Sequence, residues 1–134
     1  MRKTLILLLI LCLVLILPVV TVRAQANTVA DAVATRPEIG LFAEVLRRTG
    51  LDATLRGTGP YTVFAPVDTA IDSALAAAGL DRVALFADAA LMQRFANAHI
   101  LTVRYTRDDL RGLSLPATLA TRNNGGTLII SQTG

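Results

Sequence analysis

The chain is poor in the residues that build covalent and metal-dependent sites. Its 134 residues include one cysteine, one histidine and no tryptophan. Cys12 lies in an apolar N-terminal run, so the rest of the chain has no thiol for a disulfide or a thiolate metal site. A zinc site would need His99 together with carboxylates that the sequence does not gather around it. We therefore expect no metal and no cofactor, and a fold stabilised by a packed apolar core.

Lysine is equally scarce, since Lys3 is the only one. The formal net charge of +3 comes from 13 basic against 10 acidic residues, and Arg2, Lys3 and Arg23 all lie near the N-terminus. Without these three, ten arginines balance ten acids. A domain of this composition lacks the basic stripe that binds phosphates, so we expect no nucleic-acid partner.

The first 26 residues have the three parts of a secretory signal peptide. Two basic residues are followed by an apolar stretch over residues 5–17, then by Pro18 and by small residues at Ala24 and Ala26. We expect cleavage after Ala24 or Ala26. Residues 27–134 would then form a single domain that is secreted or held in the cell envelope.

A retained leader is the alternative. Residues 4–22 contain no charged side chain, and this length approaches that of a membrane span. In that case the leader would be the sole membrane contact of an architectural envelope protein.

Short helices are predicted directly after the leader. Thr28 and Asp31 have the spacing of a capping box, which satisfies free amides at a helix start. Apolar residues recur every three or four positions over residues 39–46, as in an amphipathic helix that Gly50 would end in a left-handed conformation. Residues 51–55 predict a further helical turn.

A strand and a helix follow in direct succession. Residues 61–64 are β-branched or aromatic, and Pro66 would end this strand because it lacks an amide donor. Asp68 stands where we expect the N-cap of the next helix, which Gly79 terminates.

The pattern then alternates between helices and strands. Residues 81–86 and 88–98 predict two helices, and residues 100–103 favour a strand. Beyond a short turn that Gly112 closes, residues 115–122 and 127–131 predict a hairpin, with positive φ expected at Asn124 and Gly125. Its second strand is too apolar for an unprotected edge, so we expect either that the last strands of the domain are missing after Gly134 or that this edge packs against another surface.

Adjacent carboxylates at Asp108 and Asp109 leave one catalytic alternative open, an envelope hydrolase that uses an acid such as Asp109. Neighbouring side chains point in different directions, which favours a capped turn instead. No serine lies in a Gly-x-Ser-x-Gly elbow, and residues 57–60 lack the lysine of a phosphate-binding loop. We therefore expect no enzyme activity.

Two motifs resemble those of fasciclin domains. The first is the string Tyr61-Thr62-Val63-Phe64-Ala65-Pro66, followed by Asp68, Ala70 and Ile71. The second is Asn97-Ala98-His99-Ile100, followed by Tyr105-Thr106 and by Asp109-Leu110.

The resemblance implies an α+β fold, a fasciclin-like β-sandwich or wedge flanked by short helices. It also implies a non-catalytic adhesion module that binds an extracellular protein or a polysaccharide, with His99, Ile100 and Tyr105 as candidate partner-binding residues. The chain departs from the family at Ala98, where a tyrosine is usual, and by lacking the closing Asp-Ile and Asn-Gly-x-x-His motifs.

The fate of the leader is directly measurable. Mass analysis of the exported protein should give an N-terminus at Gln25 or Asn27, because the small residues before them suit signal peptidase. An intact Met1 would contradict this prediction and favour the anchor.

Overall fold

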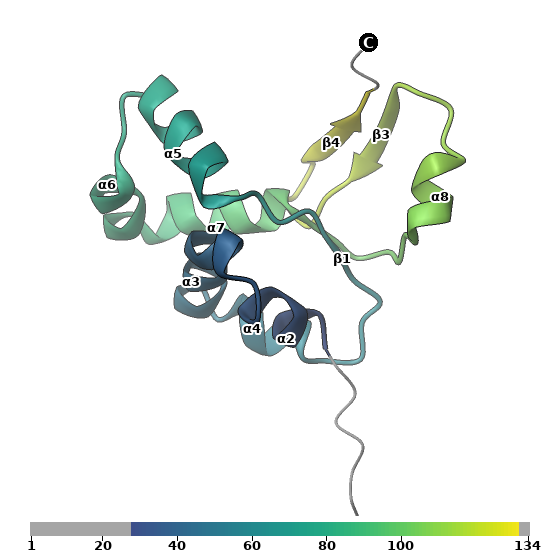
Figure 1. The fold of residues 1–134 in the computed structure, drawn as a ribbon, viewed down its shortest axis with the longest axis horizontal. Coiled ribbons are helices and arrows are strands. Elements are labelled where there is room, and N and C mark those ends of the chain that lie inside the picture. The colour runs from purple at the N-terminus through teal and green to yellow at the C-terminus, as the bar shows by residue number, and fades with distance from the viewer. Residues whose placement is uncertain (1–27, 132–134) are drawn as a thin grey trace, which may run out of the picture.

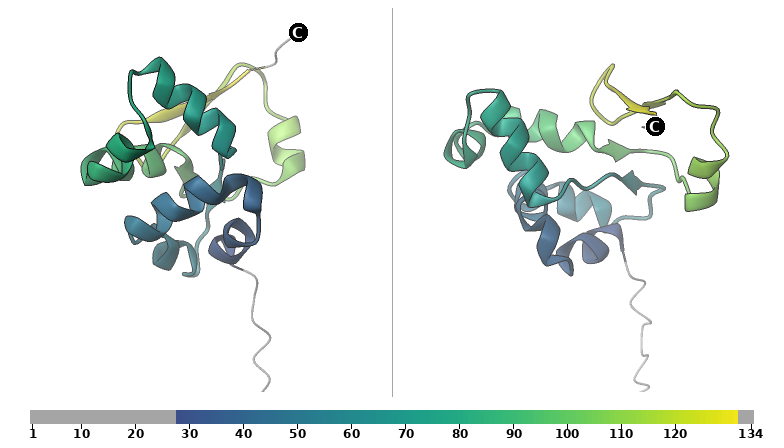
Figure 2. Two further views of the ribbon diagram at one scale, coloured as in Figure 1. Left: turned by 60° about the vertical axis from the view of Figure 1, so that its left-hand side comes forward. Right: turned by 45° about the horizontal axis from the view of Figure 1, so that its top comes forward.

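The computed structural model describes residues 28–131, which fold into a helical body and a projecting hairpin. Figure 1 shows the body formed by helices α2–α7, with the hairpin β3–β4 and helix α8 together on the other side. Figure 2 shows from two further directions that the hairpin projects away from helices α2–α4. The predicted signal peptide lies outside the described residues. Within 28–131, no helix is long and apolar enough to cross a membrane.

The N-terminal helices begin as predicted. Helix α2 (Val29–Ala34) starts at the expected capping box, in which the Thr28 hydroxyl accepts from the Asp31 amide and the Asp31 carboxylate accepts from the Thr28 amide. The 3-10 turn η1 (Pro37–Ile39) leads into α3 (Gly40–Arg48). Gly50 adopts a φ of 71° before α4 (Leu51–Leu55), which confirms the predicted left-handed turn.

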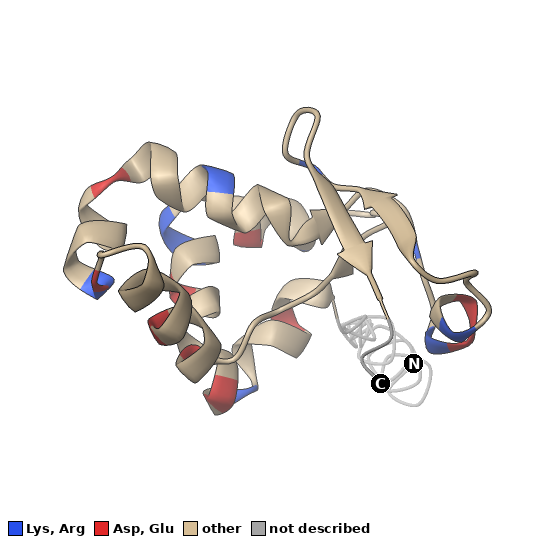
Figure 3. Ribbon diagram, turned by 90° about the horizontal axis from the view of Figure 1, so that it is seen from above, with Lys and Arg blue, Asp and Glu red and all other residues tan. Residues whose placement is uncertain are grey.

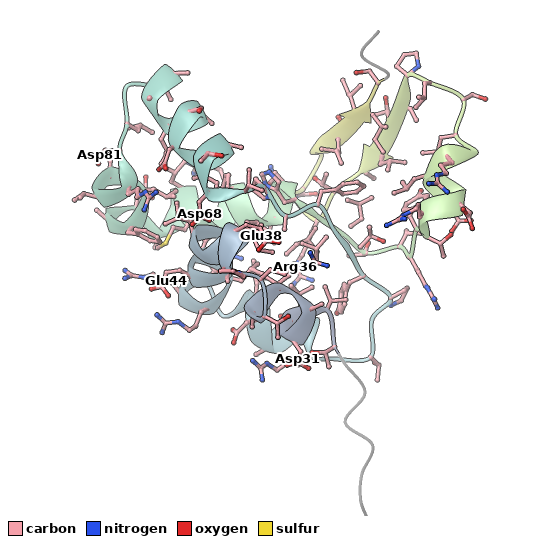
Figure 4. The ribbon with its side chains drawn as sticks, in the orientation of Figure 1. Asp31, Arg36, Glu38, Glu44, Asp68 and Asp81 are labelled. Carbon is pink, nitrogen blue, oxygen red and sulfur yellow. The ribbon has the colours of Figure 1, made fainter. Side chains whose placement is uncertain are left out.

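The strand-to-helix transition is confirmed, but the role predicted for Asp68 is wrong. Strand β1 (Thr62–Val63) precedes α5 (Asp68–Ala77), whose N-cap is Val67, a residue with no capping side chain. Asp68 is the first residue of α5, and its Oδ1 accepts from the Leu41 amide at 2.9 Å. Helix α3 has no side-chain cap of its own. The carboxylate therefore caps the first turn of a different helix, 27 positions earlier in the chain (Figure 4).

Two further helices have the caps expected of their aspartates. Asp81 accepts from the Ala84 amide at the start of α6 (Arg82–Ala87), and Asp88 accepts from the Leu91 amide at the start of α7 (Ala89–Ala98). Strand β2 (Ile100–Leu101) follows and is shorter than predicted. It pairs antiparallel with β1, Thr62 opposite Leu101 and Val63 opposite Ile100.

The core lies where α3 meets α4, α5 and α7. The Phe42 side chain is fully buried, and its ring makes an edge contact with that of Phe95 at 6.0 Å between centroids. Burying a side chain of this size contributes about 1.5–3 kcal/mol. The other side chains of the core that are almost completely buried come from six elements: Val45, Leu46, Leu55, Ile71, Leu85, Ala96 and Ile100.

The predicted hairpin is present with a longer connection than a two-residue turn. Strands β3 (Ala117–Ala120) and β4 (Thr127–Ile130) pair in register from Ala117–Ile130 to Ala120–Thr127. Only Gly125 in this loop has a positive φ, 75°, so the prediction of positive φ at Asn124 is wrong. The Gly126 amide donates to the Asn123 carbonyl at 2.6 Å, which closes a turn of the type II pattern.

The described strands form two separate two-stranded sheets. With seven α-helices among residues 28–131, including α8 (Arg107–Arg111), the chain is a mixed α+β protein as expected. The sandwich or wedge stays a prediction, because neither sheet stacks on the other as a broad layer (Figure 2). The truncation after Gly134 likewise stays untested.

The cap that Asp68 provides predicts a measurable loss of stability. Asp68→Ala leaves the half-buried Leu41 amide without its acceptor, and we expect the free energy of unfolding to fall by about 1–2 kcal/mol in urea titrations. Asp68→Asn keeps an oxygen at the same position and should recover most of this loss. Equal stability of the alanine variant and the wild type would show that the cap is dispensable.

Candidate functional site

The pairing of β1 with β2 brings the two sequence motifs side by side. The Phe64 amide donates to the His99 carbonyl at 3.0 Å, which extends the ladder beyond the paired strands. Val63 of the first motif lies opposite Ile100 of the second. The residues that the sequence singled out therefore belong to one junction between α7, β1 and β2.

His99 occupies a structural position at this junction. Its Nδ1 lies 2.8 Å from the Phe95 carbonyl, and since a carbonyl only accepts, Nδ1 carries the proton of this bond. The ring contacts Phe95 at 4.7 Å and Phe42 at 5.6 Å between centroids. His99 thus joins the aromatic centre of the core to the end of α7, and the residue as a whole is half-buried.

Ile100 and Tyr105 differ in their access to solvent. The Ile100 side chain is 1% exposed and belongs to the core, whereas Tyr105 is half-buried on the segment that leads to α8. The Thr62 hydroxyl holds this segment, donating to the Val103 carbonyl and accepting from the Tyr105 amide, both at 2.8 Å. This clamp fixes the backbone on both sides of Arg104 next to β1.

Asp109 is the N3 residue of a second capping box at the start of α8. Its carboxylate accepts from the Thr106 amide and hydroxyl, both at 2.7 Å, while the Thr106 hydroxyl accepts from the Asp109 amide. These bonds from Thr106 lower the pKa of Asp109, with a smaller contribution from the charge of Arg104. The neighbouring Asp108 points to Arg111 instead, at 3.4 Å. The two carboxylates therefore do not converge, and the role that the geometry gives Asp109 is capping.

An open hollow of about 670 Å³ lies next to the clamp. It is bounded by the start of α2, by the loop between α4 and β1, and by Arg104. Arg56 and Tyr61 also line it. Neither arginine stands out in the sequence, because residues 48 positions apart carry no common motif. The Thr62 hydroxyl sets the position of Arg104, while Arg56 is placed by the end of α4, so their proximity is visible only in the fold.

Charged groups of both signs are spread over the helices (Figure 3). Among residues 28–131, no group of three or more histidine, cysteine, aspartate or glutamate side chains is placed to hold a metal ion. In the last turn of α3, Arg47 and Arg48 both form ion pairs with Glu44.

The family model described as Fasciclin domain matches residues 37–134. The chain belongs to the fasciclin domain family. Fasciclin domains are generally extracellular adhesion or interaction modules, typically secreted or on the cell surface and typically non-enzymatic. The predicted family is thus confirmed over most of the chain, including both motifs. No curated protein gave a significant match to this fasciclin-domain chain.

The lowered pKa of Asp109 predicts a pH-dependent contribution to stability. A carboxyl whose pKa is lower in the folded state stabilises the fold above its ordinary value of 3.8, and this contribution is lost as pH falls through the folded-state pKa. We expect Asp109→Asn to lower the urea midpoint at pH 7 and to approach the wild type near pH 2. Asp108→Asn, which removes the same charge outside the cap, is the control. A difference between Asp109→Asn and the wild type that does not change with pH would contradict this account.

Proposed function

We propose that this fasciclin domain is a secreted or cell-surface adhesion module that binds an extracellular protein or a polysaccharide and performs no catalysis. The match of residues 37–134 to the family model is the observation that supports this proposal most strongly. The use of Asp109 as a helix cap also favours binding over acid–base chemistry. We propose in addition that residues 1–26 direct export as a cleaved signal peptide.

The proposed contact surface includes Tyr105 and the accessible edge of His99. Both belong to segments joined through β2, and both are half-buried, so part of each residue reaches solvent while its backbone is fixed. Ile100 would contribute by supporting this surface from the core side, since its side chain is buried. Aromatic residues with fixed backbones are frequent energetic centres of interfaces.

Tyr105→Ala tests this surface without removing the clamp, because the Thr62 hydroxyl binds the backbone amide of Tyr105 and not its ring. We expect cell or matrix adhesion to surfaces coated with the protein to fall about tenfold, as for a central interface aromatic. His99 stays unchanged in this experiment because its ring is part of the aromatic core.

Val83→Ala is the matched control. Val83 is 75% exposed on α6, which lies at the opposite side of the molecule from α8 in Figure 1. Adhesion should be unaffected by this change. Unchanged adhesion of the Tyr105 variant would remove the proposed surface, and turnover of a hydrolase substrate that Asp109→Asn abolishes would overturn the non-catalytic function.

A further inference from the structure

We infer that the hollow lined by Arg56, Arg104 and Tyr61 binds an acidic polysaccharide. Its sulfate or carboxylate groups would pair with the two guanidinium groups, and a sugar ring would lie on the Tyr61 side chain. This inference rests on the proposed interaction function and names the chemistry of one partner.

The lining of the hollow is cationic without a compensating acid. Of the residues that line it, Arg56 and Arg104 are the charged ones, and none carries a carboxylate. A hollow on the other side of Arg56 contrasts with it, because Glu44 and Asp52 line that hollow together with Arg47. Residues 28–131 contain ten arginines and ten acids, so this local excess of two arginines favours an anionic ligand.

Both arginines are available for a ligand. Within residues 28–131 neither forms an ion pair or a side-chain hydrogen bond, although Arg56 acts through space on Asp31 and Arg104 on Asp109. The carboxylates of Asp31 and Asp109 are already bonded to Thr28 and Thr106. In contrast, Arg82 is held by two bonds of 2.6 and 2.7 Å to Asp72.

The backbone on each side of the hollow is fixed. Thr62 binds the residues before and after Arg104, and the Arg56 amide donates to two carbonyls of α4 as its C-cap. The free guanidinium groups thus extend from defined positions. This arrangement lowers the entropy that binding must overcome and allows the planar fork of arginine to pair with sulfate or carboxylate oxygens.

The loop between Arg56 and Tyr61 adds neutral donors. The amides of Thr58, Gly59 and Tyr61 form no hydrogen bond with another part of the described chain. Gly59 has a φ of 64°, a conformation that residues with a side chain disfavour. A Cβ at this position would also lie 3.1 Å from the Tyr61 amide nitrogen. Amides without a partner in the described chain, next to arginines, suit the hydroxyl and acid oxygens of a sugar chain.

The shape and composition of the hollow favour a polysaccharide over other polyanions. Anionic membranes attract clusters of roughly 4–8 basic residues, and here two arginines line the hollow. Acidic peptide motifs are recognised by clusters of arginines and need no aromatic face. One half-buried aromatic ring between polar groups provides a flat apolar surface for a sugar face instead.

The test measures binding of four polymers to the purified full chain at low salt: dextran sulfate, polygalacturonate, neutral dextran and poly-glutamate. We expect binding of at least one acidic polysaccharide, none of neutral dextran, and weakening as salt rises. Preference for dextran sulfate would identify sulfate as the bound group, and preference for polygalacturonate would identify carboxylate. Arg56→Gln/Arg104→Gln should weaken this binding by at least about tenfold, since each charge-assisted contact contributes about that factor.

Arg94→Gln/Arg122→Gln is the matched control, because it removes the same charge from two arginines that lie outside the hollow and form no ion pair with a described residue. The affinity of this control variant for the acidic polysaccharide should stay within about twofold of that of the wild type. Tyr61→Leu should weaken binding of the polysaccharide while leaving any weak binding of poly-glutamate unchanged.

Three results would overturn the inference. These are absence of binding to both acidic polysaccharides, an equal loss in the two double variants, and binding of poly-glutamate as tight as that of the sugars. In each of these three cases, adhesion that the wild type shows and Tyr105→Ala loses would still support the proposed function.

Discussion

The contact of Phe42 with Phe95 and His99 is the interaction on which the other features depend. Phe42 comes from α3, while Phe95 lies in the last turn of α7 and His99 is the C-cap of that helix, so the three rings hold the two helices together. The bond from His99 Nδ1 to the Phe95 carbonyl fixes the ring, and the His99 carbonyl then accepts from Phe64. The position of β1 therefore follows from a contact inside the helical body.

The fixed backbone geometry continues from β1 to the surface of the molecule. The Thr62 hydroxyl uses its donor and its acceptor capacity on Val103 and Tyr105, which holds the approach to α8 against the strand. Tyr61 and Arg104 are neighbours for this reason, although 43 positions separate them in the sequence. A short two-stranded pairing would contribute little alone. Here it transmits a defined geometry from the aromatic core to the surface proposed for binding.

Local patterns in the sequence predicted the helices well because their starting signals are local. Thr28 and Asp31 lie three positions apart and form the capping box by themselves, as do the caps at Asp81 and Asp88. Asp68 was misassigned because its acceptor role depends on α3, which only the tertiary fold places within reach. Asn124 was misassigned because the loop spans enough residues for Gly125 alone to take the left-handed conformation.

The candidate site was predicted only in part, because local strings reveal some of its residues and tertiary contacts place the others. The motifs around Phe64 and His99 were recognisable as sequence strings, and the structure pairs them. Arg56 and Arg104 belong to no such string. The Thr62 hydroxyl places Arg104 by bonding the two neighbouring backbone groups, and a threonine in a strand gives no sign of such distant partners. The relative position of the two arginines therefore follows only from the assembled fold.

The attachment of the hairpin has a consequence for how the molecule opens. The Arg122 and Asn123 amides donate to the carbonyls of Ile100 and Asn97, which ties the loop of the hairpin to β2 and the end of α7. Leu119, 6% exposed, is the one buried side chain of its strands. Ile129, 67% exposed, adds almost nothing to the core. The hairpin can thus separate as a cooperative unit with a small free-energy cost while the helices stay folded. Its amide protons would exchange with solvent well before those of α3 and α7.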